Sequence, residues 1–362
     1  MDIASFFKFV NQRVLSSPRK PAATIAIPRE RVDEFQGKPR EEPFKRDTHY
    51  FQVVINEMFL SKARKWFWEI DPVVYVVSEF SYNGKAQVVP FLVGPNLLKE
   101  QGVPDSVASG TILRNTVVSG LHPYRGGGLT LTVVLCEVSG ENVLKPFLGI
   151  LETTAKALDF SPALAPYAKV ASLVMDGVET LFKSNGVTPI AGLREPYGPT
   201  HNTLFQPSYF AILDAQGVAE DKLWVRKKQL CHGDSLDTAK PYRGADFVLY
   251  SFAGTQDNER DDIDTLPFRD LWERVRHDAL SPKDEPDFAS ARQLMSTLCQ
   301  QVMTSPDLTD AQGGKLADEW FAKMNELHEK AKRYGPMSGE DAVAETEQLV
   351  RARERALKML KG

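Results

Sequence analysis

Residues 73–93 read VVYVVSEFSYNGKAQVVPFLV, and this stretch predicts a β-hairpin. Two runs that are rich in β-branched and aromatic residues flank the dipeptide Asn83-Gly84. That dipeptide suits a two-residue type I′ turn, because both central residues of such a turn need a positive φ. The surrounding chain is therefore expected to be built on antiparallel strands.

Further apolar and β-branched runs predict strands on both sides of this hairpin. They cover residues 49–58, 112–121, 129–138, 208–213, 223–230 and 245–253, with Gly- and Pro-containing turns between several of them. Many short strands joined by such turns favour a β-sandwich-like or open-barrel β body.

A helical hairpin is expected to interrupt the strands over residues 143–184. Each of its two segments carries one apolar stripe, with charged residues on another stripe. Ser161-Pro162 supplies a capping residue and a first-turn proline between the segments. A helix with one apolar stripe normally buries it against its own protein, so the insert is expected to be an element of the fold first.

The C-terminal region, residues 265–362, is predicted to be α-helical. Apolar residues recur there at helical spacing, for example Leu316, Trp320, Met324 and Leu327 in a helix expected over 309–334. Gly335-Pro336 ends that pattern, and a last helix with acidic residues early and basic residues late is expected after it. Helices appended to a β body place the protein in the α+β class.

The N-terminal part is expected to lie outside the β-rich domain, which spans residues 48–264. Residues 1–15 predict an amphipathic helix, and residues 16–47 hold five prolines among mixed charges, which is typical of a linker. No run approaches about 18 uncharged apolar residues, so no transmembrane segment is expected. The amphipathic first helix leaves peripheral contact with a membrane open.

Charge and cysteine content restrict the partners and the compartment. The net charge of −4 creates no basic field, so the sequence carries no strong sign of nucleic-acid binding. Three widely spaced cysteines, Cys136, Cys231 and Cys299, fit reduced thiols better than a disulfide framework. A cytoplasmic protein is therefore expected.

An acidic cluster follows the strand expected at 245–253. It consists of Asp257, Glu259, Asp261, Asp262 and Asp264. Calcium takes roughly six to eight oxygen ligands, so this cluster is a candidate calcium or magnesium site. It lacks the central Gly and distal Glu of an EF-hand loop, and carboxylates are also favoured before a helix N-terminus. A solvated loop is the favoured interpretation, so no cofactor is expected.

The tetrapeptide Pro-Tyr-Arg-Gly occurs twice, at 123–126 and at 241–244, each time before an expected strand. One interpretation makes Tyr124, Arg125, Tyr242 and Arg243 contacts for an anion or a partner at one end of the body. The favoured alternative is a turn whose Tyr caps the core and whose Gly supplies a positive φ.

No catalytic residue can be assigned from the sequence. The six histidines show no metal-ligand spacing, and the sequence has no nucleophile-elbow, Walker or dinucleotide motif. The pattern favours a non-catalytic protein-interaction or assembly component of the cytoplasm, which binds a protein partner or associates with itself. A membrane-acting effector, pore-forming or lipid-binding, is the second hypothesis. A divalent-metal-dependent hydrolase or nuclease that uses the acidic cluster is the third.

Overall fold

The protein is described by a computed structural model, which divides into two compact units, Met1–Arg260 and Asp261–Gly362. The residues described are 12, 23–39, 42–60, 64–65, 68–82, 85–93, 111–118, 121–139, 187–198, 205–213, 217–256, 266–280, 285–305 and 307–334. The helical hairpin expected at 143–184, the acidic cluster at 257–264 and the last helix expected after 335 lie outside them. So does the first helix expected at 1–15, apart from Gln12.

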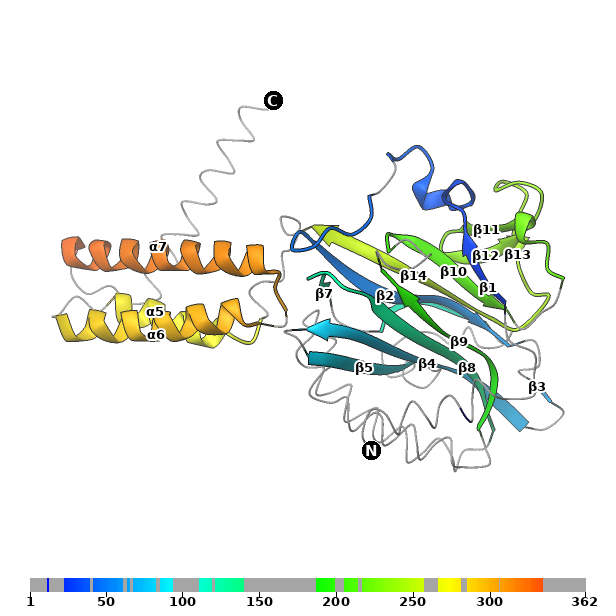
Figure 1. Ribbon diagram of the computed structural model, residues 1–362, viewed down its shortest axis with the longest axis horizontal. Coiled ribbons are helices and arrows are strands. Elements are labelled where there is room, and N and C mark those ends of the chain that lie inside the picture. Colours follow the sequence, from blue (N-terminus) through cyan, green and yellow to red (C-terminus); the bar gives the residue numbers. More distant parts are fainter. Residues whose placement is uncertain are drawn as a thin grey trace. The chain divides into compact units, whose positions relative to one another are not determined.

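The first unit contains a six-stranded antiparallel sheet, which we call the central sheet (Figure 1). Its order is β1 (Ala23–Ile27), β10 (Ser208–Leu213), β14 (Phe247–Gln256), β2 (His49–Phe59) and β6 (Thr111–Val117), and β7 (His122–Pro123) also pairs with β2. Strand β1 lies inside the stretch expected as a linker. Ile25 and Ile27 point the same way and are buried, a period-two signal that the neighbouring prolines obscure.

The second sheet contains the hairpin expected at residues 73–93. Its strands are β3 (Arg64–Lys65), β4 (Trp68–Tyr82), β5 (Lys85–Val93), β8 (Leu129–Ser139) and β9 (Val187–Tyr197). Tyr82 pairs with Lys85, so only two residues connect β4 with β5. Strand β9 was not expected, because Pro189 and Pro196 interrupt its short apolar run.

The two sheets contribute to one hydrophobic core. The central sheet supplies Val53, Ile55, Val248 and Tyr250, and the second sheet supplies Val74, Val76, Val133 and Leu135. Each of these side chains alternates with one that points the other way along its strand. Full burial of one such aliphatic side chain contributes about 1.5–3 kcal/mol, so this core accounts for much of the stability of the unit.

The opposite face of the central sheet carries a second core, beneath a small third sheet of β11 (Leu223–Arg226), β12 (Gln229–His232) and β13 (Lys240–Pro241). The single strand expected at 223–230 is therefore wrong: it is a hairpin that turns at Lys227 and Lys228. Their φ angles of 51° and 61° are those of a type I′ turn. The sequence hides this turn because it has neither Asn nor Gly there.

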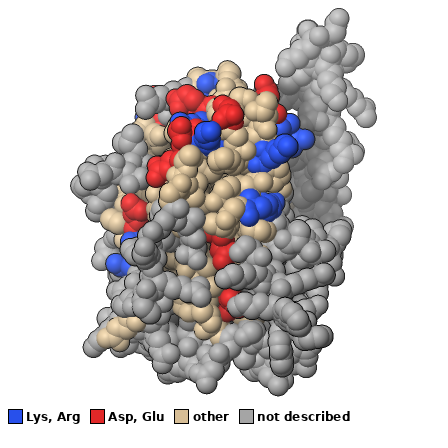
Figure 2. All heavy atoms as spheres, turned by 90° about the vertical axis from the view of Figure 1, so that its right-hand side faces the viewer, with Lys and Arg blue, Asp and Glu red and all other residues tan. Residues whose placement is uncertain are grey.

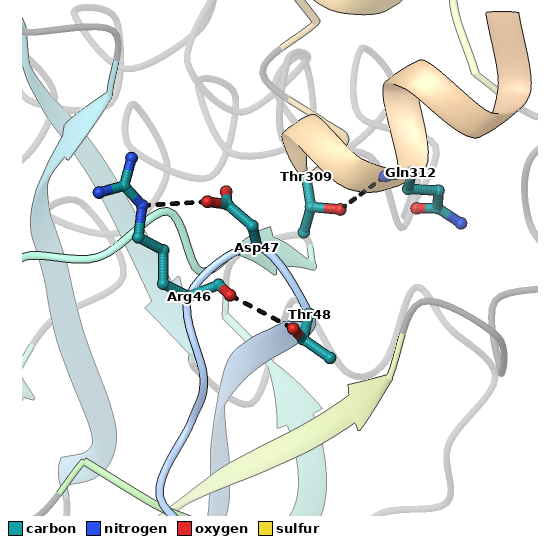
Figure 3. Close-up of polar contacts among 5 residues, drawn as sticks. All are labelled: Arg46, Asp47, Thr48, Thr309 and Gln312. Carbon is teal, nitrogen blue, oxygen red and sulfur yellow. Dashed lines mark hydrogen bonds and ion pairs between the residues drawn. The ribbon is translucent and has the colours of Figure 1, made fainter.

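The second unit consists of helices in its described residues: α5 (Arg269–Ala279), α6 (Glu285–Met303) and α7 (Asp310–Tyr334). The helix expected over 309–334 is α7, whose bounds differ from the expected ones by one residue. Trp272 of α5 stacks on Trp320 of α7 with ring centroids 4.9 Å apart. Thr309 caps α7, since its Oγ1 accepts the N–H of Gln312 at 3.1 Å (Figure 3). None of the described helices combines the length and the apolar character needed to cross a membrane.

Candidate binding pocket

A pocket of about 760 Å³ lies beside the second core, on the same face of the central sheet. Four neighbouring strands supply its floor, with Tyr209 on β10, Ser251 and Ala253 on β14, Gln52, Val54 and Asn56 on β2, and Val117 on β6. One wall comes from residues 34–39 and 42–49, which lie between β1 and β2 in the chain (Figure 1). This volume falls within the range of small-molecule and peptide side-chain sites.

Asn56 is set apart on the pocket floor by a break in both of its strand ladders. Its neighbour Ile55 pairs with Tyr250 of β14 and with Thr116 of β6, and Glu57 pairs with Leu249 and Leu113. Asn56 itself has no partner in either ladder. A bulge of this kind turns a side chain away from the regular alternation, and such bulges occur next to functional sites.

The Asn56 side chain is buried, with 1% of its surface exposed. Its Nδ2 donates a hydrogen bond to Oδ1 of Asn115, 3.1 Å away, and Asn115 adopts a left-handed φ of 47°. Among the described residues, nothing donates a hydrogen bond to Oδ1 of Asn56. A buried acceptor left in this state costs about 1–3 kcal/mol. A ligand that brings a donor to this oxygen would recover part of that cost.

Glu34 and Tyr209 place a carboxylate beside a buried phenol in the pocket. Glu34 lies on the short 3₁₀ helix η3 (Asp33–Phe35). Burial raises the pKa of Tyr209, and so do the charge of Glu34 and a hydrogen bond with it, because the neutral phenol donates to the carboxylate. A hydrogen bond with Ser251 acts the other way. Tyr209 is therefore a neutral donor beside the carboxyl group of Glu34.

The wall of the pocket is tied to the small sheet at one end. Oδ2 of Asp33 accepts the backbone N–H of Lys227 at 2.7 Å, at the tip of the β11–β12 hairpin. Nη2 of Arg29 donates to the carbonyl oxygens of Lys38 and Pro39 at 3.1 and 2.6 Å. The guanidinium of Arg29 also lies 4.8 Å from the centre of the Phe35 ring. These contacts join this end of the wall to the small sheet and to the wall's own backbone.

The other end of the wall is held at the start of β2. Nδ1 of His49 accepts the N–H of Lys45 at 3.1 Å, so the neutral imidazole carries its proton on Nε2. The Phe44 ring packs edge-on to Phe205 with centroids 4.8 Å apart. It also covers Gly254 so closely that a Cβ there would collide with the ring. Gly254 is therefore part of what positions Phe44.

The turn that leads into β2 is stabilised by its own side chains (Figure 3). Nε of Arg46 donates to Oδ2 of Asp47 at 3.0 Å, and Oγ1 of Thr48 donates to the carbonyl oxygen of Arg46 at 3.3 Å. Asp47 has a left-handed φ of 57°, and its N–H donates to the carbonyl oxygen of Tyr124 at 2.8 Å.

The charges around the pocket are of both signs. Glu34 and Glu42 line it together with Lys228. Glu42 forms an ion pair with Lys45, and the hydrogen bond in this pair lowers the pKa of Glu42. On the face shown in Figure 2, basic and acidic side chains of the described residues are interspersed. This distribution does not resemble the single-sign surface that nucleic acid attracts.

The structure does not bring the two Pro-Tyr-Arg-Gly segments to one place. The N–H of Tyr124 donates to the carbonyl oxygen of His49 at the start of β2, and the Tyr124 ring enters the shared core. Nη2 of Arg243 lies 3.0 Å from Oε1 of Glu57, near the end of β2. The expected arrangement at one end of the body is therefore not found. Contact of these residues with an anion or partner stays a prediction.

Sequence patterns did not point to Glu57, a buried acidic residue among the described part of this unit. Its Oε2 accepts the N–H of Leu230 at 2.8 Å, and its Oε1 faces Arg243. Burial raises the pKa of Glu57, and the contacts with Leu230 and Arg243 oppose that effect. The signal was present in the strand sequence VVINEMF, where Asn56 and Glu57 interrupt an apolar run.

The remaining candidate residues are the acidic cluster, two of the cysteines and His122. The acidic cluster lies outside the described residues, and within them no group of three or more His, Cys, Asp and Glu could hold a metal ion. Cys136 and Cys231 are buried, and burial raises the pKa of both thiols. His122 is buried against Phe51 and Phe80, and burial lowers its pKa to about 3.

Comparisons with protein families, with curated proteins and with solved structures find no match for this chain.

Proposed function

We propose that the protein is a non-catalytic interaction component of the cytoplasm, which holds a polar segment of a partner protein in this pocket. The observation that carries the proposal is Asn56, which belongs to the lining of a pocket of about 760 Å³ and whose buried Oδ1 has no hydrogen-bond donor among the described residues. In this proposal the body of the protein is a β-sandwich-like domain, and the helical insert at 143–184 is an accessory element.

The construction of the pocket supports binding. Its floor lies on hydrogen-bonded strands, and its wall is fixed by Asp33, Arg29 and Phe44 through contacts within the chain. A site that is formed before its ligand arrives loses little conformational freedom on binding. The hydrogen-bonding groups are neutral amides and hydroxyls apart from Glu34, Glu42, His49 and Lys228, which suits recognition of a polar segment.

A photo-crosslinking experiment tests this proposal. A diazirine-bearing lysine analogue replaces Lys228, which lines the pocket, and in a control protein it replaces Lys222, which pairs with Asp234 away from the pocket. We expect one protein to be crosslinked in cells from position 228 and not from position 222. The substitution Ala253→Trp fills the pocket and should remove that product.

The fold of the filled variant is checked by circular dichroism and by its melting temperature, with Gln52→Trp as a second pocket-filling variant. Equal crosslinking from both positions, or crosslinking that persists in two folded and filled variants, contradicts the proposal. The membrane-acting and metal-dependent alternatives involve residues 1–15, 143–184 and 257–264, and no contact in the described residues favours them.

A further inference from the structure

We infer that this pocket recognises a guanidinium group, such as that of an arginine side chain. The inference rests on the proposed function, because it names the chemical group that occupies the same pocket. It begins from the buried Oδ1 of Asn56, which requires a hydrogen-bond donor and cannot be satisfied by an anion.

The other groups of the pocket require a positive charge together with several donors. Glu34 presents a carboxylate there, and the amide of Gln52 and the hydroxyl of Ser251 add neutral acceptors. A guanidinium carries five N–H donors in a plane and no acceptor, so it can reach a carboxylate and an amide oxygen at once. An ammonium is a compact, strongly hydrated charge, and it costs more to desolvate.

Aromatic rings provide the second part of the site. The rings of Phe35 and Tyr209 line the pocket with centroids 6.0 Å apart. A weakly hydrated planar cation stacks on such rings, and the protein already uses this contact, since the guanidinium of Arg29 lies over Phe35. The pocket thus combines hydrogen-bond acceptors with aromatic rings, and both its floor and its wall contribute to each set.

Glu34 is the carboxylate of the pocket that an added cation can meet, because Glu42 already pairs with Lys45. Glu34 and Glu42 oppose Lys228, and Lys45 compensates Glu42 from outside the pocket lining. Lys228 lies on the exposed hairpin tip and places a like charge at the pocket, which solvent screens only in part. Its replacement should therefore strengthen the binding of a guanidinium.

Titration of the full-length protein by isothermal calorimetry tests the inference with three matched probes. These are N-acetyl-arginine methylamide, its neutral isostere N-acetyl-citrulline methylamide and N-acetyl-lysine methylamide. The arginine probe should bind about tenfold more tightly than either of the others, since a charge-assisted hydrogen bond contributes about 1.5–3 kcal/mol. Lys228→Gln should tighten its binding severalfold.

Two carboxylate variants localise the binding. Glu34→Gln should weaken the arginine probe about tenfold, which corresponds to one charge-assisted hydrogen bond. Glu30→Gln, an exposed residue on the neighbouring 3₁₀ helix and outside the pocket lining, should change nothing. Equal affinity for the arginine and citrulline probes, or equal effects of the two variants, overturns the guanidinium inference.

A further comparison separates this inference from the proposed function. A glycine-flanked arginine peptide that binds more tightly than agmatine supports both. Tighter binding of agmatine supports the guanidinium but indicates a small molecule, and it counts against a protein partner. If crosslinking to a partner depends on the pocket while no probe prefers a guanidinium, the proposed function stands and this inference fails.

Discussion

Arg243 places its Nη2 3.0 Å from Oε1 of Glu57, and the Glu57 side chain is fully buried. Through this contact, and through the hydrogen bond from Leu230, a charge on the central sheet is joined to the layer that covers it. The same β2 segment carries Asn56 on the pocket floor. The attachment of the small sheet and the shape of the pocket are therefore connected through two consecutive residues.

Replacement of Arg243 by Met should destabilise the first unit by about 2–3 kcal/mol, because it leaves the Glu57 carboxylate buried without its ion pair. Met keeps much of the apolar contact with Phe59, over which the guanidinium lies. Urea denaturation followed by fluorescence measures the change.

Arg226→Met is the control, since the Nη1 of Arg226 donates a hydrogen bond to the backbone oxygen of Asp237, 3.3 Å away on the exposed surface. It should change the free energy of unfolding by less than about 0.5 kcal/mol. Equal losses of stability in Arg243→Met and Arg226→Met would show that the ion pair between Arg243 and Glu57 does not stabilise the unit.

The pH dependence of stability should report Glu57. Burial raises its pKa above the usual value of 4.5, so the folded state holds this proton at a pH where the unfolded state has released it. The contribution of Glu57 to stability therefore falls as pH rises above 4.5. Between pH 4.5 and 7, the unfolding free energy of the wild type should therefore decrease relative to that of Glu57→Gln. An increase over this range would mean that the pair with Arg243 outweighs burial.

His122 should make the protein less stable as the pH falls, which is opposite to the effect of Glu57. Its pKa is lowered from 6.5 to about 3, so the unfolded state takes up a proton that the folded state refuses. Stability should fall as pH drops below 6.5, by up to about 1.4 kcal/mol per pH unit. His122→Phe keeps a ring between Phe51 and Phe80 and should abolish this pH dependence of stability. Urea midpoints at pH 7.5, 6 and 5 test it, and equal slopes in both proteins would refute the assignment.

The β11–β12 turn should be improved by the combined substitution Lys227→Asn and Lys228→Gly. Both lysines hold left-handed backbone angles that Asn and Gly adopt more readily, so stability should rise by about 1 kcal/mol. The backbone N–H that bonds to Asp33 is kept. Thermal unfolding measures the gain. A lower melting temperature would show that the lysine side chains contribute more than the strain costs.

Gly254→Ala should displace the Phe44 ring, because the added Cβ meets it directly. Overpacking of this kind costs about 1–3 kcal/mol, and here it also moves a wall of the pocket. Phe44→Leu shortens the colliding ring, so the double variant should lose less stability than the sum of the two single variants. Additive losses would show that the two residues do not compete for this space.

The local elements were largely predictable from the sequence. Asn83-Gly84 predicted the hairpin, because its conformational freedom acts over four residues. The spacing of Trp320, Met324 and Leu327 predicted α7, because one helical face must be buried. The β11–β12 hairpin was missed because its turn residues, Lys227 and Lys228, have no turn preference. Their conformation is imposed by strand pairing and by Asp33.

The pocket could not be predicted in the same way, since its lining residues are spread from Glu34 to Thr255. Asn56 and Glu57 looked like ordinary interruptions of a strand. The roles of the two residues depend on the neighbouring strands. Asn56 becomes a residue of the pocket floor, and Glu57 becomes the partner of Arg243 in an ion pair.

By itself, the sequence determined the α+β class, the hairpin and the C-terminal helices, because backbone preference and side-chain periodicity act within a few residues. The tertiary structure alone decided which face of the central sheet each layer covers, where Asn56 leaves both ladders and which charge Arg243 meets. Those features depend on residues far apart in the chain, such as Glu57 with Arg243 and Ile55 with Tyr250. Local preference carries no information over such separations, whereas packing and strand register do.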